Sequence, residues 1–302
     1  MQRLRNLRSI ITFRMDKKEY IDEFISTCRD LGIARGDIVY ISSDVTGLTL
    51  NACRKCRIKG KAEINTFYGE LVDALKSMVG EEGTFLFPVF TWDFCRGKGF
   101  DVKTTQGEVG ALGNWVLNNR SDFVRTEHPL YSFMVCGKDA SMLADLHNRS
   151  AWGSDSPFAY MYENKAKSLL IGTTLEDCFT FAHFVEENIG VPFRYYKDFH
   201  GKYTDKDGRT SDRTYTMYVR DLDIDSSQVT PDDCLIDAGV SQRKETNGIS
   251  VEVVDLAASY PYIEENYRKN NFDQWYDFKG YVVDWEAGQT HPDETTMTVP
   301  GR

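Results

Sequence analysis

The sequence lacks any apolar run that approaches the ~20 residues a membrane-spanning helix requires. Its first residues carry scattered arginines, but they lack the apolar segment that a signal peptide contains. We therefore expect a cytoplasmic protein without a membrane partner.

Basic residues are fewer than acidic ones: the sequence contains 36 lysines and arginines and 46 aspartates and glutamates, which gives a formal net charge of -10. The sequence contains no basic stripe with interleaved aromatic residues, which nucleic-acid binding would require. We expect no nucleic-acid partner. A cationic or amine-bearing substrate agrees better with this charge balance.

A disulfide framework is missing as well. The seven cysteines are an odd number scattered through core-like and loop-like segments, which fits a reducing compartment and free thiols. Cys53 and Cys56 form a lone Cys-x-x-Cys, without the two further ligands nearby that zinc needs. We expect no metal.

Ordinary globular composition, with 41% apolar and 27% charged residues, predicts a folded chain. Predicted strands and helices alternate along its first two thirds. The strands are expected at 37–42, 83–88 and 167–171, and the helices at 16–31, 65–79, 139–147 and 178–188. This alternation predicts an α/β fold with a mainly parallel mixed sheet flanked by helices, and ligand-binding loops beyond the carboxyl ends of its strands.

The later segments differ from this pattern. Residues 193–203 and 213–220 are rich in Tyr, Phe, Thr and Val and flank a turn at Asp205–Gly208, so they predict an added antiparallel hairpin. A last strand and a helix at 255–269 complete the core. We expect a single α/β domain over residues 1–285 and a C-terminal tail over 286–302.

The segment from Thr180 to Glu187 holds the most informative titratable group. On a helix, Thr180, His183 and Glu186 form an i, i+3 row, so their side chains face one cleft. An imidazole there accepts a proton from an attacking amine at physiological pH. The alternative is a surface histidine beside a carboxylate, and spacing alone favours that alternative.

A second polar segment runs from Arg125 to Phe133. Pro129 holds the chain extended and leaves Arg125, His128 and Ser132 as polar groups in a loop. The planar fork of Arg125 suits a phosphate, because it offers two donors at once. An ordinary solvated loop explains the segment equally well.

Four segments together carry a family resemblance. They are Pro88–Asp93, Arg125–Phe133, Gly153–Phe158 and Thr180–Glu187. The last three follow, in order, the family pattern of an Arg-Ser-x-His-Pro-x-x-Ser segment, a Gly-x-x-Ser-Pro segment and, after a strand ending in Gly, Thr-x-x-His-x-x-Glu. Over roughly residues 30 to 270 the chain resembles the aminoglycoside 3-N-acetyltransferase family.

The resemblance implies direct transfer of an acetyl group from acetyl-coenzyme A to an amino group of a sugar. His183 falls on the family's general base. The carboxylate that orients this base is expected shortly after the hairpin, where Asp221 is our choice and Asp223 the alternative. Glu186 is expected to help hold the substrate amine, and a salt bridge is its structural alternative.

The same resemblance assigns two sets of binding residues. Coenzyme contacts are expected along Ser42, Ser43, Arg125, Ser132 and Ser156. Substrate contacts are expected at Thr180, His128, Asp93 and Trp92.

Departures from the family pattern leave the acceptor open. Asn114 and Leu117 replace a family Glu and Arg, which indicates a less cationic sugar, and residues Thr49–Ala62 resemble an inserted loop. The acceptor is either an aminoglycoside, with a role in antibiotic resistance, or a biosynthetic amino sugar. An alternative outside enzyme catalysis is that the chain is a sugar-binding or scaffold protein of the same fold. A homo-oligomer is left open.

Overall fold

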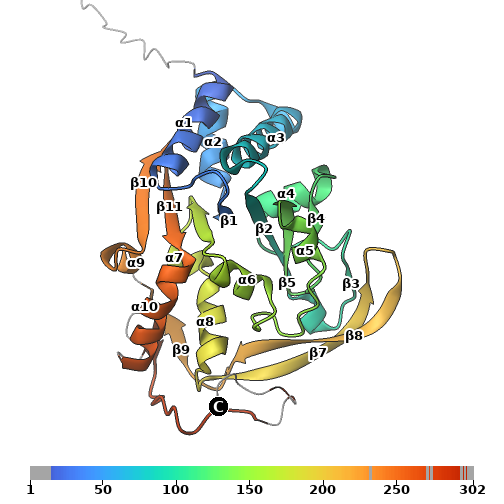
Figure 1. Ribbon diagram of the computed structural model, residues 1–302, viewed down its shortest axis with the longest axis vertical. Coiled ribbons are helices and arrows are strands. Elements are labelled where there is room, and N and C mark those ends of the chain that lie inside the picture. Colours follow the sequence, from blue (N-terminus) through green and yellow to red (C-terminus); the bar gives the residue numbers. More distant parts are fainter. Residues whose placement is uncertain are drawn as a thin grey trace, which may run out of the picture.

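A seven-stranded sheet, in the order β10-β11-β6-β1-β2-β5-β4, forms the centre of the computed structural model (Figure 1), which describes residues 15–230, 233–269, 272, 275–292, 295 and 297. Its strands are β1 (Ile38–Ser43), β2 (Thr84–Phe90), β4 (Val124–Arg125), β5 (Tyr131–Gly137), β6 (Lys167–Ile171), β10 (Ser241–Thr246) and β11 (Ile249–Asp255). The central strands β6, β1 and β2 are parallel, while β5 and β11 run opposite to their neighbours. Since only those two strands are reversed, the predicted mainly parallel mixed sheet is confirmed.

Helices cover both faces of this sheet (Figure 1). One face packs against α1 (Lys17–Asp30), α2 (Thr46–Cys56), α3 (Gly60–Val79) and α4 (Ala111–Asn119), and the other against α6 (Pro157–Glu163), α8 (Phe181–Ile189) and α10 (Leu256–Lys269). Shorter helical segments are η1 (Asp93–Arg96), α5 (Ala140–Ala144), α7 (Leu175–Cys178) and α9 (Cys234–Asp237). Successive β1 residues alternate between the two cores, because Val39 and Ile41 join one cluster and Tyr40 joins the other.

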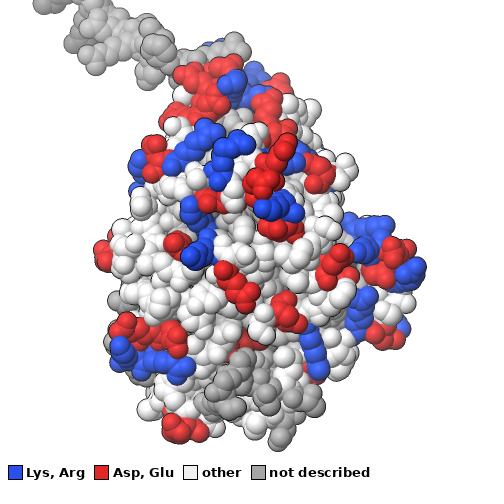
Figure 2. All heavy atoms as spheres, in the orientation of Figure 1, with Lys and Arg blue, Asp and Glu red and all other residues white. Residues whose placement is uncertain are grey.

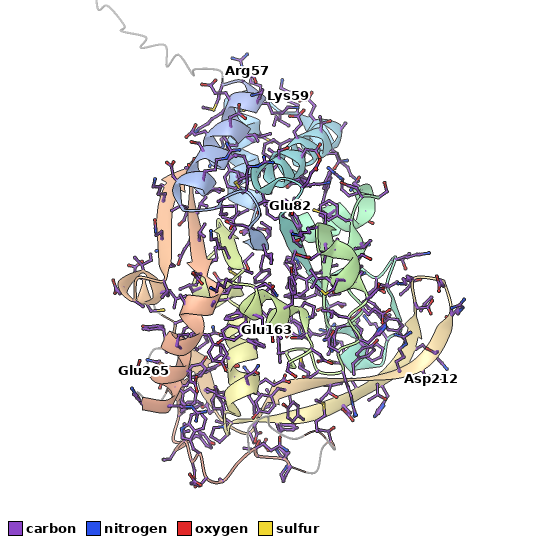
Figure 3. The ribbon with its side chains drawn as sticks, in the orientation of Figure 1. Arg57, Lys59, Glu82, Glu163, Asp212 and Glu265 are labelled. Atoms are coloured by element: carbon purple, nitrogen blue, oxygen red, sulfur yellow. The ribbon has the colours of Figure 1, made fainter. Side chains whose placement is uncertain are left out.

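The first helix is where the apolar spacing predicted it. Asp16 caps α1 by accepting a hydrogen bond from the Lys18 backbone N–H at 2.8 Å, and Tyr20 and Phe24 are fully buried. The segment Thr49–Ala62 is not the expected loop. It forms most of α2 and the start of α3, with Arg57 in the left-handed region between them (Figure 3).

The predicted hairpin is confirmed as β7 (Arg194–Thr204) paired with β8 (Thr210–Arg220). Its turn is fixed by Asp205, whose Oδ1 accepts hydrogen bonds from the backbone of Asp207 and Arg209, both at 2.9 Å. The short strand β3 (Phe100–Asp101) joins β7 in parallel. This hairpin crosses the lower end of the molecule in Figure 1.

The C-terminal residues return to the body of the protein. Strand β12 (Tyr276–Phe278) pairs with β9 (Ser226–Gln228). Farther on, the ring of His291 lies 4.4 Å from that of Tyr195 on β7, so this part of the predicted tail contacts the hairpin.

Charged side chains of both signs are intermixed on the face drawn in Figure 2, and neither sign dominates it. Many form exposed pairs, such as Lys138 with Glu82 at 2.9 Å. All seven cysteines are free thiols. Among the described helices, none combines the length and apolar character needed to cross a membrane.

Candidate active site

A pocket of about 320 Å³ lies beyond the carboxyl ends of the parallel strands. Ser42 and Ser43 reach it from the end of β1, and Trp92 follows the end of β2. Thr180 and His183 enter from the start of α8, which comes after β6. This is the edge at which α/β sheets bind ligands, as the strand and helix order predicted.

A larger cavity, of about 640 Å³, is lined by Lys103, Val124 and Lys138, among others. It shares no lining residue with the pocket beside His183. Volume alone does not locate chemistry, so we place the candidate active site at the smaller pocket, which contains the titratable imidazole.

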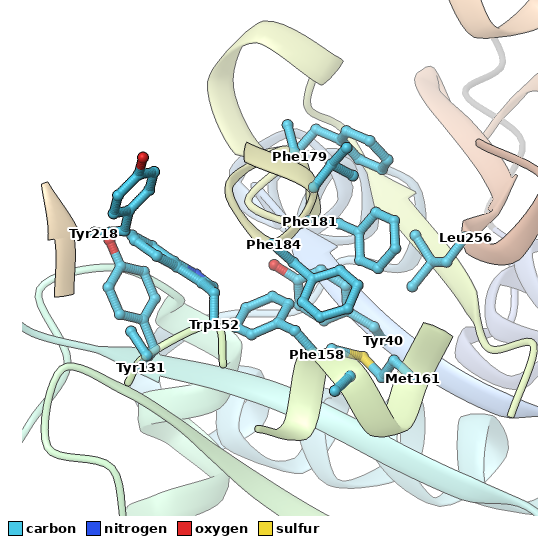
Figure 4. Close-up of a cluster of buried hydrophobic side chains, with 14 of the residues drawn as sticks. Tyr40, Tyr131, Trp152, Phe158, Met161, Phe179, Phe181, Phe184, Tyr218 and Leu256 are labelled. Atoms are coloured by element: carbon cyan, nitrogen blue, oxygen red, sulfur yellow. The ribbon is translucent and has the colours of Figure 1, made fainter. Parts of the chain in front are cut away.

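Buried aromatic rings, among them the Tyr131 and Trp152 labelled in Figure 4, pack next to the pocket residues. Tyr131 packs against Phe90 with ring centroids 4.9 Å apart and against Trp152 at 4.7 Å. Trp152 in turn contacts the ring of His183 at 5.1 Å. Because close-packed rings leave little free volume, this wall restricts the orientations open to the imidazole.

His183 is held by a buried carboxylate on its own helix. Its Nδ1 atom lies 2.7 Å from Oε2 of Glu186, one helical turn farther along α8. The His183 side chain is 26% exposed, whereas that of Glu186 is 0% exposed. A carboxylate on Nδ1 favours the tautomer with the proton there, which leaves Nε2 as the free proton acceptor.

Arg194, the first residue of β7, neutralises this carboxylate. Its Nε lies 2.8 Å from Glu186 Oε2, and its Nη2, which can only donate, lies 3.2 Å from His183 Nδ1 and competes with the shorter Glu186 contact for that nitrogen. Burial alone would raise the pKa of Glu186, but the adjacent Arg194 and His183 lower it to about 2. Glu186 is therefore ionised across the physiological range.

Asp221 is not the carboxylate on His183. Its Oδ2 lies 3.3 Å from Nε2 of His291, and its Oδ1 accepts a hydrogen bond from the backbone of Asp223 at 2.9 Å. The carboxyl oxygens of Asp221 and Asp223 and a nitrogen of His291 lie within 4.8 Å of one another. The prediction failed because the i, i+3 neighbour Glu186 reaches the imidazole without any help from the hairpin.

Arg125 and Ser132 make hydrogen bonds within the fold. Arg125 is buried, and its guanidinium donates to Ser132 Oγ at 3.0 Å and to three backbone carbonyls. Ser132 Oγ itself donates to the carbonyl of Val89 at 3.0 Å. These internal hydrogen bonds use four of the five N–H groups of Arg125, and neither residue lines the pocket beside His183.

Ser156 and His128 also serve the fold. Ser156 is buried and caps α6 by accepting from the Ala159 backbone N–H at 3.2 Å. His128 is 0% exposed, and burial lowers its pKa to about 3. His128 does not line the pocket beside His183 in this structure, and its contact with a substrate stays a prediction.

The remaining predicted residues divide into two groups. Ser42, Ser43, Trp92 and Thr180 line the pocket with His183. Asp93 does not line it, because its carboxylate is paired with Arg96 at 3.0 Å and Lys98 at 2.8 Å.

Asn114 does not present a free amide to an acceptor. Its Oδ1 accepts from the Gly107 backbone N–H at 2.7 Å, and its Nδ2 donates to the Gly107 carbonyl at 2.8 Å. These bonds secure the loop that brings Val109 and Gly110 to the pocket. The inference of a less cationic sugar from Asn114 therefore has no support in its contacts.

Sequence reasoning missed three residues of the site: Arg194, Tyr267 and Tyr276. Tyr276 donates to Glu186 Oε1 at 2.6 Å and Tyr267 does so at 3.2 Å. Both tyrosines are distant from α8 in sequence, so no local spacing reveals them. The one signal in the sequence was Glu186 itself, because a buried carboxylate requires hydrogen-bonding or charged partners.

Comparison with known proteins gives a family and a fold. A sequence model described as aminoglycoside 3-N-acetyltransferase matches residues 57–262, which is more than half of the chain. No curated protein sequence matches.

Several solved structures share the fold. Aminoglycoside acetyltransferase AAC(3)-Xa has a TM-score of 0.64 at 20% identity, covering 82% of this chain and 91% of that chain. AAC-IIIb, solved as a binary complex with CoASH, has a TM-score of 0.64 at 17% identity, covering 89% and 99%. Sisomicin-bound AAC-VIa has a TM-score of 0.63 at 19% identity, covering 85% and 99%. The chain belongs to the aminoglycoside 3-N-acetyltransferase family of enzymes.

Proposed function

We propose that this chain transfers an acetyl group from acetyl-coenzyme A to an amino group of an aminoglycoside or another amino sugar, with His183 as general base. The observation that carries the proposal is the pairing of His183 Nδ1 with the buried Glu186 carboxylate at 2.7 Å, at the edge of a pocket. Family membership supports the same reaction class.

The pairing suits proton abstraction. A substrate ammonium must lose a proton before its nitrogen can attack a thioester carbonyl. Glu186 holds the Nδ1–H of His183, and the unprotonated Nε2 accepts the amine proton. The new C–N bond forms as the C–S bond breaks. Of the two protons that the ammonium nitrogen loses, the departing thiolate takes one and His183 releases the other to solvent.

The pocket has the chemical character that a pantetheine arm requires. Apolar lining residues such as Pro88 and Phe90 stand beside hydroxyl groups of Ser42, Ser43 and Thr180. These hydroxyl groups can donate to and accept from the amides of the arm. Acetyl-coenzyme A supplies the activated acyl group when it is bound.

The acceptor side is expected to be cationic. Asp177 adds a carboxylate to the pocket lining, and the whole chain carries a net charge of -10. AAC-VIa, a structural neighbour, is bound to sisomicin, and AAC-IIIb binds CoASH, which makes these two ligands the first to test.

The test is a screen of acetyl-coenzyme A turnover, measured as thiol release, against aminoglycosides and nucleotide-linked amino sugars. We expect acceptor-dependent thiol release with members of one panel. Binding of coenzyme A is measured separately by calorimetry. Release with neither panel would overturn the proposed acceptors, and an absence of coenzyme A binding as well would favour the non-catalytic alternative.

A further inference from the structure

The carboxylate of Glu186 has two contacts on each of its oxygens, of which three are hydrogen bonds and one is an ion pair. Oε2 is shared by His183 at 2.7 Å and Arg194 at 2.8 Å. Oε1 accepts from Tyr276 at 2.6 Å and from Tyr267 at 3.2 Å. A carboxylate offers about four lone-pair sites, so three hydrogen bonds and the adjacent guanidinium leave it little freedom to rotate.

Both tyrosines come from the C-terminal part of the chain, beyond residue 262, where the family match ends. Tyr267 lies near the end of α10, and Tyr276 begins β12. Strand β12 is anchored by its pairing with β9, in which Tyr276 lies opposite Gln228. The C-terminal segment thus reaches the far side of the carboxylate that holds the imidazole.

Ring packing does not account for the hydroxyl groups. The Tyr276 ring contacts Phe193 at 5.0 Å, and the Tyr267 ring contacts Phe272 at 4.6 Å. Phenylalanine would preserve both contacts in this aromatic cluster. Each hydroxyl is instead directed at Glu186, and the Tyr276 oxygen also accepts from Arg194 Nη2 at 3.2 Å.

We propose that Tyr276, assisted by Tyr267, is a positioning residue for His183, which acts by locking the Glu186 carboxylate in the orientation that holds Nδ1–H. This inference rests on the proposed function of His183 as general base. Neither tyrosine touches the substrate in this arrangement, and both act through Glu186.

The ionisation of these groups is consistent with donation. Burial, followed by the Glu186 carboxylate, raises the pKa of Tyr276 and of Tyr267 above the ordinary value for tyrosine. Both hydroxyls therefore keep their protons across the physiological range and donate them to Oε1. Loss of the Tyr276 hydroxyl leaves Oε1 with one long hydrogen bond, so the carboxylate can rotate away from His183.

The experiment compares Tyr276→Phe and Tyr267→Phe with Tyr203→Phe as a matched control. Tyr203 is fully buried, stacks on Phe100 at 5.4 Å and donates to the Glu127 carbonyl at 2.9 Å, so its variant also removes one buried hydroxyl. We expect Tyr276→Phe to lower kcat about 10-fold with unchanged KM for acetyl-coenzyme A. A smaller decrease is expected for Tyr267→Phe, whose hydrogen bond is longer.

The pH–rate profile separates positioning from mere packing. With the carboxylate free to rotate away from Nδ1, the imidazolium loses part of its stabilisation, so the midpoint of the pH–rate profile for Tyr276→Phe should move to lower pH. The Tyr203→Phe profile should match the wild type. Wild-type kcat and midpoint in Tyr276→Phe, or equal losses in Tyr276→Phe and Tyr203→Phe, would overturn the proposal.

A measurement that does not depend on catalysis tests the role of Tyr276 separately from the proposed function. Nitrogen-15 NMR of the imidazole, assigned with His183→Ala, reports which ring nitrogen of His183 carries the proton. The wild type should show the Nδ1–H form, and Tyr276→Phe should show a mixture of tautomers. An inactive wild type defeats the proposed function, whereas an identical tautomer in both proteins defeats the role of Tyr276.

Discussion

His183 Nδ1 lies 2.7 Å from Oε2 of Glu186, and the glutamate is completely buried while the histidine is partly exposed. His183 therefore faces the pocket, whereas Glu186 lies in the interior. A buried ionised carboxylate needs compensation, and Arg194 supplies it at 2.8 Å. The site thus consists of a buried ion pair, Glu186 with Arg194, and of the His183 imidazole, which connects this pair to the pocket.

Replacement of Glu186 by Gln should lower both stability and turnover. It leaves the buried Arg194 without its counter-ion, so the free energy of unfolding should fall by about 3 kcal/mol in urea titrations. Turnover should fall as well, because the amide no longer enforces the Nδ1–H tautomer.

Glu252→Gln is the matched control for that variant. Glu252 is 2% exposed and pairs with Arg243 at 2.8 Å, but it does not line the pocket. The Glu252→Gln variant should have a lower free energy of unfolding and the kcat of the wild type. Equal kcat values in the two variants would contradict the role of Glu186.

Replacement of Asp221 by Asn should leave kcat within about twofold of the wild type, because Asp221 pairs with His291 rather than His183. The measurement is steady-state thiol release with the acceptor identified by the screen. A 100-fold loss would restore Asp221 as the carboxylate that supports the base.

Arg125→Met should destabilise the fold without weakening coenzyme binding. The buried guanidinium satisfies carbonyls of Val89, Val102 and Thr105, so their loss of partners should lower the free energy of unfolding by roughly 3 kcal/mol. The KM for acetyl-coenzyme A should stay at its wild-type value. A raised KM with unchanged stability would mean that Arg125 binds the coenzyme.

The neighbouring Glu187 should make stability depend on pH. Burial raises its pKa to about 7, although hydrogen bonds from Ser150 oppose the shift. The folded state therefore binds its proton more tightly than the unfolded state, whose glutamate pKa is about 4.3. This contribution is fully present below about pH 4.3 and is lost as the pH rises to about 7.

Glu187→Gln removes that titration. Between about pH 4 and 7, the wild type should lose about 3 kcal/mol of unfolding free energy relative to this variant. Denaturant titrations at several pH values measure the difference. If the difference in unfolding free energy between the wild type and Glu187→Gln stayed constant over this pH range, Glu187 would be ionised in the folded protein throughout it.

Local patterns predicted four of the seven strands of the central sheet (β1, β2, β6 and β11) and the helices α1, α3, α8 and α10, because their apolar spacing records burial. The strand at 167–171 and the helix at 16–31 agree with β6 and α1 to within a residue or two. The helix α2 was missed because it presents few apolar residues to the core. Of those, Leu48 and Ala52 are buried.

The site was predictable only where its residues are neighbours in sequence. The His183 and Glu186 spacing follows from one helical turn, so their proximity was anticipated. Arg194 and Tyr276 approach Glu186 through tertiary folding, which no window of the sequence contains. Of the predicted coenzyme contacts, Ser42 and Ser43 line the pocket, whereas Arg125, Ser132 and Ser156 make hydrogen bonds within the fold, because a family motif records fold-stabilising hydrogen bonds as readily as ligand contacts.

Comparison of His183→Ala with the wild type tests the central claim most directly. Acceptor-dependent thiol release is measured at saturating acetyl-coenzyme A, after circular dichroism has verified that the variant is folded. Since a positioned general base contributes about 100-fold or more, the variant should be slower by at least about that factor. A folded His183→Ala variant that turns over at the wild-type rate would contradict the account.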